Sequence, residues 1–227
     1  MSEELGKIQK PPVENFTAGR KLYFVPLIFS DPQLPLDISL KYSAYWDQVE
    51  SQITNLEEKL GPVKYLFHEL VQDSGAEALK SLEQIHSGSL PLLTSRMQKG
   101  ASFEALEEED VLTELMDWSR CLSLGLQNQR VYTQIYQSYI AVNDKRNETI
   151  AKKIDDTLKG NESCIVIMGE GHHVKFPENI QVFYIAPPAL DEIKRWAREQ
   201  QAKEQAAHVH DENCEHGDCE HKTGGPG

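Results

Sequence analysis

The chain has 227 residues, of which 39% are hydrophobic and 26% are charged. This composition supports one folded domain with extensions, and no apolar run reaches the roughly 18 residues needed to cross a bilayer. The formal net charge of −13 disfavours nucleic acid and anionic lipid as partners. The first residues lack the apolar stretch of an export signal, so we expect a cytoplasmic protein with reduced cysteines.

Short apolar runs alternate along the chain with longer segments of helical periodicity. Residues 1–20 are predicted to form an irregular N-terminal arm, because Pro11-Pro12 and Gly19 break any helix. Strands are predicted over residues 22–29, 63–71, 163–168 and 181–185. Helices are predicted over residues 40–60, about 75–86, most of 102–158, and 189–207. This order favours an α/β fold in a single domain, residues 21–207, with a mixed sheet flanked by helices and a long helical insertion.

Residues 208–227 concentrate metal-binding side chains and are expected to be a disordered tail. Cys214-Glu-His216 and Cys219-Glu-His221 are the same triplet repeated five residues apart, and Gly217 between them lets the chain reverse. Thiolates and imidazoles together suit Zn(II), Ni(II) or Co(II), with the identity of the metal left open. The alternative is a solvated, low-complexity terminus with incidental ligands. The predicted metal ligands in this tail are His208, His210, Cys214, His216, Cys219 and His221.

Ionisable residues also follow two of the predicted strands. Glu69 and His68 lie near the end of the strand at 63–71, and Gly169-Glu-Gly-His-His173 follows the strand at 163–168. Binding groups in α/β proteins gather at the carboxyl ends of strands, so a carboxylate and an imidazole there could share a metal ion or form an acid/base pair. Each motif also has a purely structural interpretation, as an exposed strand end and a tight turn.

The stretch from Arg146-Asn147, through a helix and a β-rich strand, to Gly169-Glu-Gly-His172 resembles the C-terminal part of the TraB/Tiki-like family. The resemblance implies a metal-dependent protein, since Tiki members act as proteases and other members in pheromone shutdown. The family pattern has two Gly-x-x-His motifs, a glutamate after the second strand, and an arginine before the last helix. The resemblance therefore implies catalytic roles for Glu69, Arg146 and His172, with Arg146 holding a carboxylate or a substrate oxyanion.

The chain departs from that pattern where the first Gly-x-x-His is expected. The matching stretch reads Pro26-Leu-Ile-Phe29, and a phenylalanine does not bind metal. Under the resemblance, His172 is then a metal ligand, and His173 or His68 stands in for the missing one. We also expect Glu69, Arg146 and His172 to lie around one cleft at the carboxyl ends of the strands.

Three functions stay open from the sequence. The first is a metal-binding protein of TraB/Tiki-like fold whose chelating tail serves metal storage, delivery or sensing. The second is a metal-dependent hydrolase or protease-like enzyme, which the missing Gly-x-x-His disfavours. The third is a protein whose long helices bind a partner or a second copy of the chain, with metal modulating the contact.

The acidic tract 107–110 is expected to be a solvated helix start, favoured by the helix dipole.

Overall fold

Five strands form one sheet in the computed structural model, which describes residues 18–31 and 33–214. The strand order is β3-β2-β4-β1-β5. The strands are β1 (Arg20–Pro26), β2 (Tyr65–His68), β3 (Ser102–Phe103), β4 (Ser163–Met168) and β5 (Ile180–Tyr184). Every described pairing is parallel, so the prediction of a mixed sheet is wrong. Each connection crosses back to the amino end of the sheet; even residues 169–179, which contain no helix, are long enough to do so.

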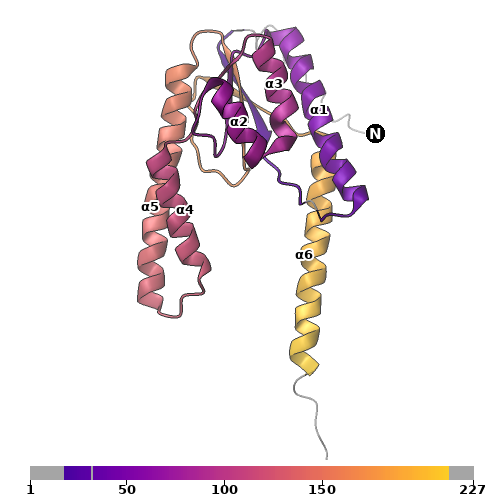
Figure 1. Ribbon diagram of the computed structural model, residues 1–227, viewed down its shortest axis with the longest axis vertical. Coiled ribbons are helices and arrows are strands. Elements are labelled where there is room, and N and C mark those ends of the chain that lie inside the picture. Colours follow the sequence, from indigo (N-terminus) through magenta and orange to yellow (C-terminus); the bar gives the residue numbers. More distant parts are fainter. Residues whose placement is uncertain (1–17, 32, 215–227) are drawn as a thin grey trace, which may run out of the picture.

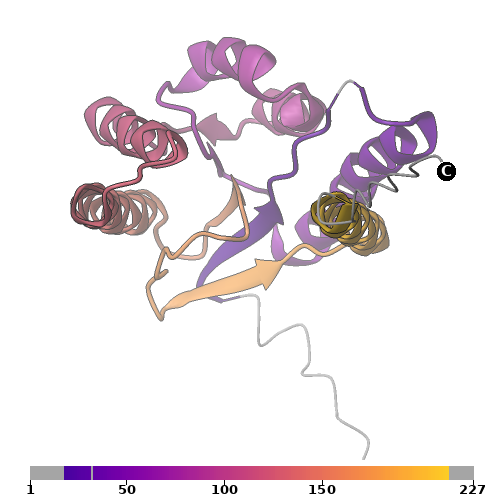
Figure 2. The ribbon, with the colours of Figure 1, turned by 90° about the horizontal axis from the view of Figure 1, so that it is seen from below.

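Helices cover both faces of this sheet, as the view along the longest axis shows (Figure 2). The helices are α1 (Leu36–Leu60), α2 (Gly75–Ile85), α3 (Leu90–Gln98), α4 (Glu109–Ser123), α5 (Gln129–Thr157) and α6 (Pro188–Cys214), with a 3₁₀ turn η2 (Ser87–Ser89). Helices α1, α2, α3 and α6 lie on one face, and α5 lies on the other with α4 against it. The α/β architecture expected from the element order is therefore confirmed.

Two apolar clusters form the core because side chains alternate across each strand. In β1, Tyr23 and Val25 face α1 and pack with Val49, whereas Leu22 and Phe24 face α5. Strand β4 is buried along its whole length, as its continuous apolar sequence predicts. The strand in the centre of the sheet thus carries a core on both of its faces.

Several element boundaries differ from the sequence expectation. Strand β1 ends at Pro26 rather than at 29, and β2 ends at His68 because Leu70 takes a positive φ of 69° that turns the chain. The segment 102–158 begins with β3 and a loop instead of a helix, and α4 starts only at Glu109. Helix α3 has no counterpart among the predicted elements.

The two ends of the chain bear on the predicted domain limits. Strand β1 begins at Arg20, inside the predicted arm, whose residues 1–17 lie outside the described part. Helix α6 continues through the predicted boundary at 207 to Cys214, so the tail expected to be disordered begins as helix. Residues 215–227 lie outside the described part. None of the helices described is both long and apolar enough to span a bilayer.

Candidate functional site

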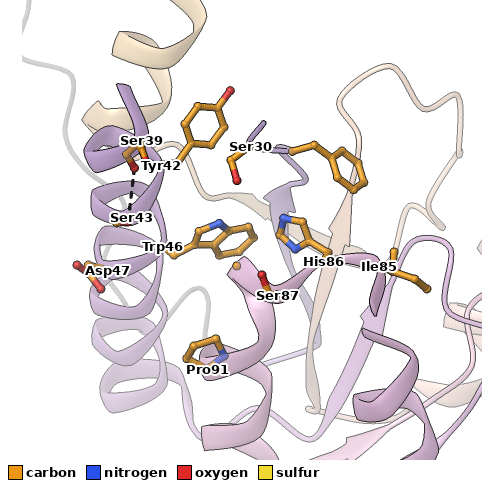
Figure 3. A pocket seen from close by; sticks show the side chains of 12 residues that line it. Ser30, Ser39, Tyr42, Ser43, Trp46, Asp47, Ile85, His86, Ser87 and Pro91 are labelled. Carbon is orange, nitrogen blue, oxygen red and sulfur yellow. Dashed lines mark hydrogen bonds between the residues drawn. The ribbon is translucent and has the colours of Figure 1, made fainter. Parts of the chain in front are cut away.

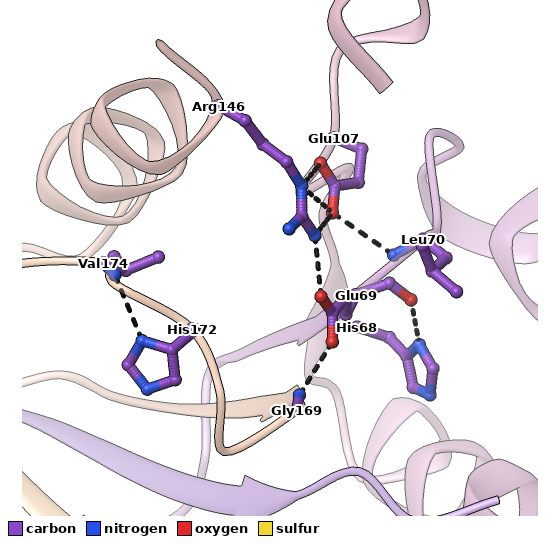
Figure 4. A network of polar contacts seen from close by, with 8 residues as sticks. All are labelled: His68, Glu69, Leu70, Glu107, Arg146, Gly169, His172 and Val174. Atoms are coloured by element: carbon purple, nitrogen blue, oxygen red, sulfur yellow. Dashed lines mark hydrogen bonds and ion pairs between the residues drawn. The ribbon is translucent and has the colours of Figure 1, made fainter. Parts of the chain in front are cut away.

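Three charged side chains meet at the carboxyl edge of the sheet, and we call Glu69, Glu107 and Arg146 the carboxyl-edge cluster (Figure 4). Arg146 Nη2 donates to Glu69 Oε1 at 2.8 Å, and Arg146 Nε donates to Glu107 Oε2 at 2.9 Å. Arg146 Nη2 also pairs with Glu107 Oε1. The side chains are 18%, 1% and 9% exposed for Glu69, Glu107 and Arg146, so the guanidinium bridges two carboxylates with little help from water.

Glu69 is held from both ends. Its backbone N–H donates to Ile167 O at 2.8 Å, which extends the pairing of β2 with β4 one residue beyond the strand. Its carboxylate Oε2 accepts a hydrogen bond from Gly169 N at 2.7 Å. A Cβ atom at position 169 would lie 3.3 Å from that same oxygen, so glycine allows the close approach. The glycine-rich turn after β4 therefore serves to fix the carboxylate that follows β2.

Glu107 is the member that the sequence interpretation missed, since the tract 107–110 was expected to be solvated. Glu107 is 3% exposed and precedes α4 by two residues. Its Oε1 accepts from Leu70 N at 3.3 Å, and its backbone carbonyl accepts from Lys153 Nζ at 3.0 Å.

A signal for a buried carboxylate was present in α5. Val142, Arg146, Ile150 and Ile154 recur every four residues and are all buried. An arginine in a buried helical stripe needs a carboxylate partner, because an unpaired charge is costly to desolvate.

The electrostatics of the cluster follow from this pairing. Burial alone would lower the pKa of the Arg146 guanidinium, but the hydrogen bonds and charges of Glu107 and Glu69 outweigh burial and raise that pKa above its usual value. Arg146 is therefore a permanent cation at this edge. It neutralises one of the two carboxylate charges and leaves the cluster with a net negative charge.

His172 lies on the same side of the sheet but makes no hydrogen bond to the cluster among the described residues (Figure 4). Its Nδ1 accepts from Val174 N at 3.2 Å, which leaves the proton of the neutral ring on Nε2. The imidazole packs on Phe24, with ring centroids 4.9 Å apart. Burial lowers the pKa of His172; the charge of Glu69 opposes this, and Arg146 and the exposed His173 add to it.

His68, considered above as a substitute for the missing metal ligand, points to the other side of the sheet (Figure 4). It is fully buried, and its Nδ1 donates to the carbonyl oxygen of Glu69 at 2.5 Å. Its Nε2 has no partner within residues 18–31 and 33–214, and burial lowers its pKa to about 4. His68 is thus a neutral core histidine whose ring lies 5.6 Å from that of His86.

A cavity of about 430 Å³ opens beside these histidines, on the side of the sheet covered by α1 (Figure 3). Trp46 and His86 form its aromatic wall, with ring centroids 5.2 Å apart. His86 is fixed because its Nε2 donates to Ile28 O at 2.9 Å. Gly88 gives the indole room, since a Cβ there would lie 2.7 Å from Trp46 Nε1. Phe29, at the position where the TraB/Tiki-like resemblance leads one to expect a histidine, lines this cavity and packs edge-on against His86.

The structure describes the backbone at three of the six predicted ligands of the C-terminal segment. His208, His210 and Cys214 fall on the last two turns of the α6 backbone, and His216, Cys219 and His221 lie outside the described residues. In the part of the chain that the structure describes, no group of three or more His, Cys, Asp or Glu side chains is arranged to hold a metal ion.

Comparison of the chain with protein-family models, with curated proteins and with solved structures gave no match.

Proposed function

We propose that the protein binds transition-metal ions through its C-terminal segment, in metal storage, delivery or sensing, and that its α/β domain is the carrier. The observation that supports this proposal best is the position of Arg146. Its guanidinium already lies between Glu69 and Glu107, so the two best-placed carboxylates of the domain have a cation as their partner. A divalent ion at this edge would compete with that permanent charge.

The placement of α6 also supports the proposal. Ile193 is the last buried residue of α6 among those with described side chains, and the helix backbone continues to Cys214 (Figure 1). A helix rises about 1.5 Å per residue, so the 21 residues between them span roughly 30 Å. The helix thus carries the backbone of residues 208–214, the first part of the donor-rich segment, away from the sheet, where an ion can be loaded and released.

The chemistry of that segment suits exchangeable binding. Two Cys-x-His triplets supply two thiolates and two imidazoles, the donor set of a four-coordinate site for Zn(II), Ni(II) or Co(II). Their spacing is not that of a folded zinc finger. We propose a cytoplasmic location, because a reducing compartment keeps these thiols available; the cysteines whose side chains the structure describes, Cys121 and Cys164, are free.

Calorimetry with Zn(II) tests the proposal on the full chain and on a chain ending at Ala207, both reduced. We expect binding to the full chain and its loss on truncation, with weaker binding below about pH 6 as imidazoles and thiolates take up protons. The matched control is the full chain with His172→Ala and His173→Ala, which should bind as the wild type does. Equal stoichiometry in the full and shortened chains would sink the proposal.

A second candidate is a metal-dependent hydrolase, a distant TraB/Tiki-like relative in which α4 and α5 are a helical insertion. The contact of Glu69 with Arg146, and the electrostatic influence of both on His172, favour it. Cleavage of labelled casein with Co(II) or Mn(II) is the test. Activity that survives truncation at Ala207 but is lost in Glu69→Gln would establish the hydrolase. No cleavage by the wild type would reject it.

A further inference from the structure

The distal half of the α4–α5 pair extends beyond the sheet without a core of its own (Figure 1). From residue 113 to residue 141, none of the side chains is buried. The same helix α5 is well buried nearer the sheet, where Ile150 and Ile154 pack on β4. Helices in proteins draw most of their stability from packing an apolar face, so this half of the pair lacks the partner that the other half has.

An apolar surface lies on this unpartnered half. The structure has eleven exposed large hydrophobic side chains among its described residues; five of them belong to this helix pair, and a sixth, Leu124, lies in the loop that joins the two helices. Tyr132, Tyr136 and Ile140 recur every four residues along α5 and form one stripe, which we call the α5 stripe. The rings of Tyr132 and Tyr136 stack with centroids 6.0 Å apart. Such a concentration marks an interaction surface rather than scattered surface apolar residues.

Charge indicates which partner fits the α5 stripe. No residue from Val131 to Asn143 is charged, although 26% of the chain is. The protein as a whole carries a net charge of −13, so two copies repel each other over most of their surface. The face of α5 around the stripe is one place where like charges do not oppose the approach of a second copy. Tyrosine enrichment with charge depletion is also the composition of interface cores.

We propose that the chain forms a two-fold dimer in which the α5 stripes of two copies pack against each other. In an antiparallel arrangement about an axis at Tyr136, each Tyr136 faces its equivalent and each Tyr132 faces the partner's Ile140. The four helices α4 and α5 of the two copies then form a bundle that buries the apolar face of both pairs. This proposal is independent of the metal-binding function.

The protein's own N-terminal segment is the less suitable occupant. The chain enters the sheet at the opposite end, where Gly19 N donates to Asn161 Oδ1 and Arg20 Nη1 pairs with Asp155 at 2.6 Å. Asp155 lies 19 residues from Tyr136 along one continuous helix, which is roughly 28 Å at the helical rise. A segment attached there would have to run back along the outside of α5 to reach the stripe.

Light scattering on the full-length protein at tens of micromolar, with a chelator and a reductant, tests the proposal. The chelator and the reductant prevent association through the C-terminal cysteines and histidines. We expect a mass of twice 25.8 kDa for the wild type. A wild type that stays at 25.8 kDa under these conditions overturns the proposal.

Charge-swap variants at Tyr136 test the two-fold arrangement. Tyr136→Glu and Tyr136→Lys should each dimerise roughly tenfold or more weakly, since like charges then face each other. An equimolar mixture should regain the dimer mass, because Glu faces Lys, and this recovery also shows that both variants fold. Leu40→Glu, a change at a 60% exposed position of α1, is the control and should leave the dimer intact. Dimers of unchanged affinity in either Tyr136 variant, or a mixture that stays monomeric, overturn the arrangement.

Discussion

His68 and Glu69 are consecutive residues at the end of β2, and the fold treats their titratable side chains in opposite ways. Glu69 points to the α5 side, where Arg146 and Gly169 N bind its carboxylate. His68 points to the α1 side, where it is fully buried, keeps a neutral ring and leaves Nε2 without a partner among the described residues. Alternation along the strand therefore separates an ion-paired environment from an apolar one within a single peptide unit.

Burying a charged group costs free energy, and the two sides of the sheet reduce this cost in different ways. A buried charge must be paired, and Arg146 and Glu107 provide the pairing on one side. A buried base can instead lose its proton and become neutral. The low pKa of His68 shows that the imidazole on the other side is neutral. The first solution makes the fold depend on a partner residue, and the second makes it depend on pH.

The largest expected effect comes from breaking the ion-paired side. Arg146→Leu should lower the free energy of unfolding by about 3–5 kcal/mol, because it leaves the Glu107 carboxylate buried without a counter-charge. Urea denaturation at pH 7 measures the loss. The double variant Arg146→Leu, Glu107→Leu should recover at least half of it. A loss below about 1 kcal/mol in the single variant would mean that the cluster is not a buried ion pair in solution.

The stability of the folded protein should depend on pH through His68, on the neutral side of β2. The folded pKa of His68 is about 4, below the usual value of 6.5, so between these values the unfolded chain binds a proton that the folded chain does not. The contribution of the neutral His68 to the free energy of unfolding is complete above pH 6.5 and is lost as the pH falls toward 4. It amounts to something on the order of 3 kcal/mol.

The variant His68→Asn isolates this contribution. Unfolding free energies of the variant and the wild type at several pH values between 7 and 4 give the comparison, because other titrating groups contribute equally to both. The wild type should lose more stability with acid than the variant does. Parallel curves would show that His68 is not held neutral in the folded protein.

A smaller effect distinguishes the two carboxylates of the cluster. Glu69→Gln keeps an oxygen for Gly169 N but turns its amide NH2 toward Arg146, so both the charge and the hydrogen bond to Arg146 are lost, and we expect a loss of about 1–2 kcal/mol. Glu107→Gln is the matched substitution at a side chain only 1% exposed, and it should cost more. Thermal unfolding of both variants at pH 7 ranks them. The reverse ranking would place the main pairing of Arg146 with Glu69.

The smallest effect is expected from the C-terminal segment, which neither side of β2 needs. Truncation after Ala207 in metal-free buffer should change the free energy of unfolding by less than about 0.5 kcal/mol, because the last buried residue known in α6 is Ile193. Thermal unfolding with and without the segment is the measurement. A drop of more than a few degrees would assign the segment a structural role.

The sequence by itself determined the elements whose signals are local. The continuous apolar run of β4 marked a buried strand, and apolar spacing of three and four residues marked the helices that flank the sheet. The repeated Cys-Glu-His triplet, a local sequence pattern, predicted a donor set for the C-terminal segment, and this stays a prediction. Such patterns can be recognised without a structure, because hydrophobic periodicity, secondary-structure propensity and ligand type are properties of residues close together in the sequence.

The tertiary structure alone decided which residues meet. Glu107 and Arg146 are 39 residues apart in sequence, and nothing near Glu107 distinguished it from its solvated acidic neighbours. The separation of His68 from Glu69 depended on which way β2 faces, and the parallel sheet depended on how each connection crosses. These outcomes follow from long-range packing: a buried charge acquires its partner, and a histidine its neutrality, only when the elements around them are assembled.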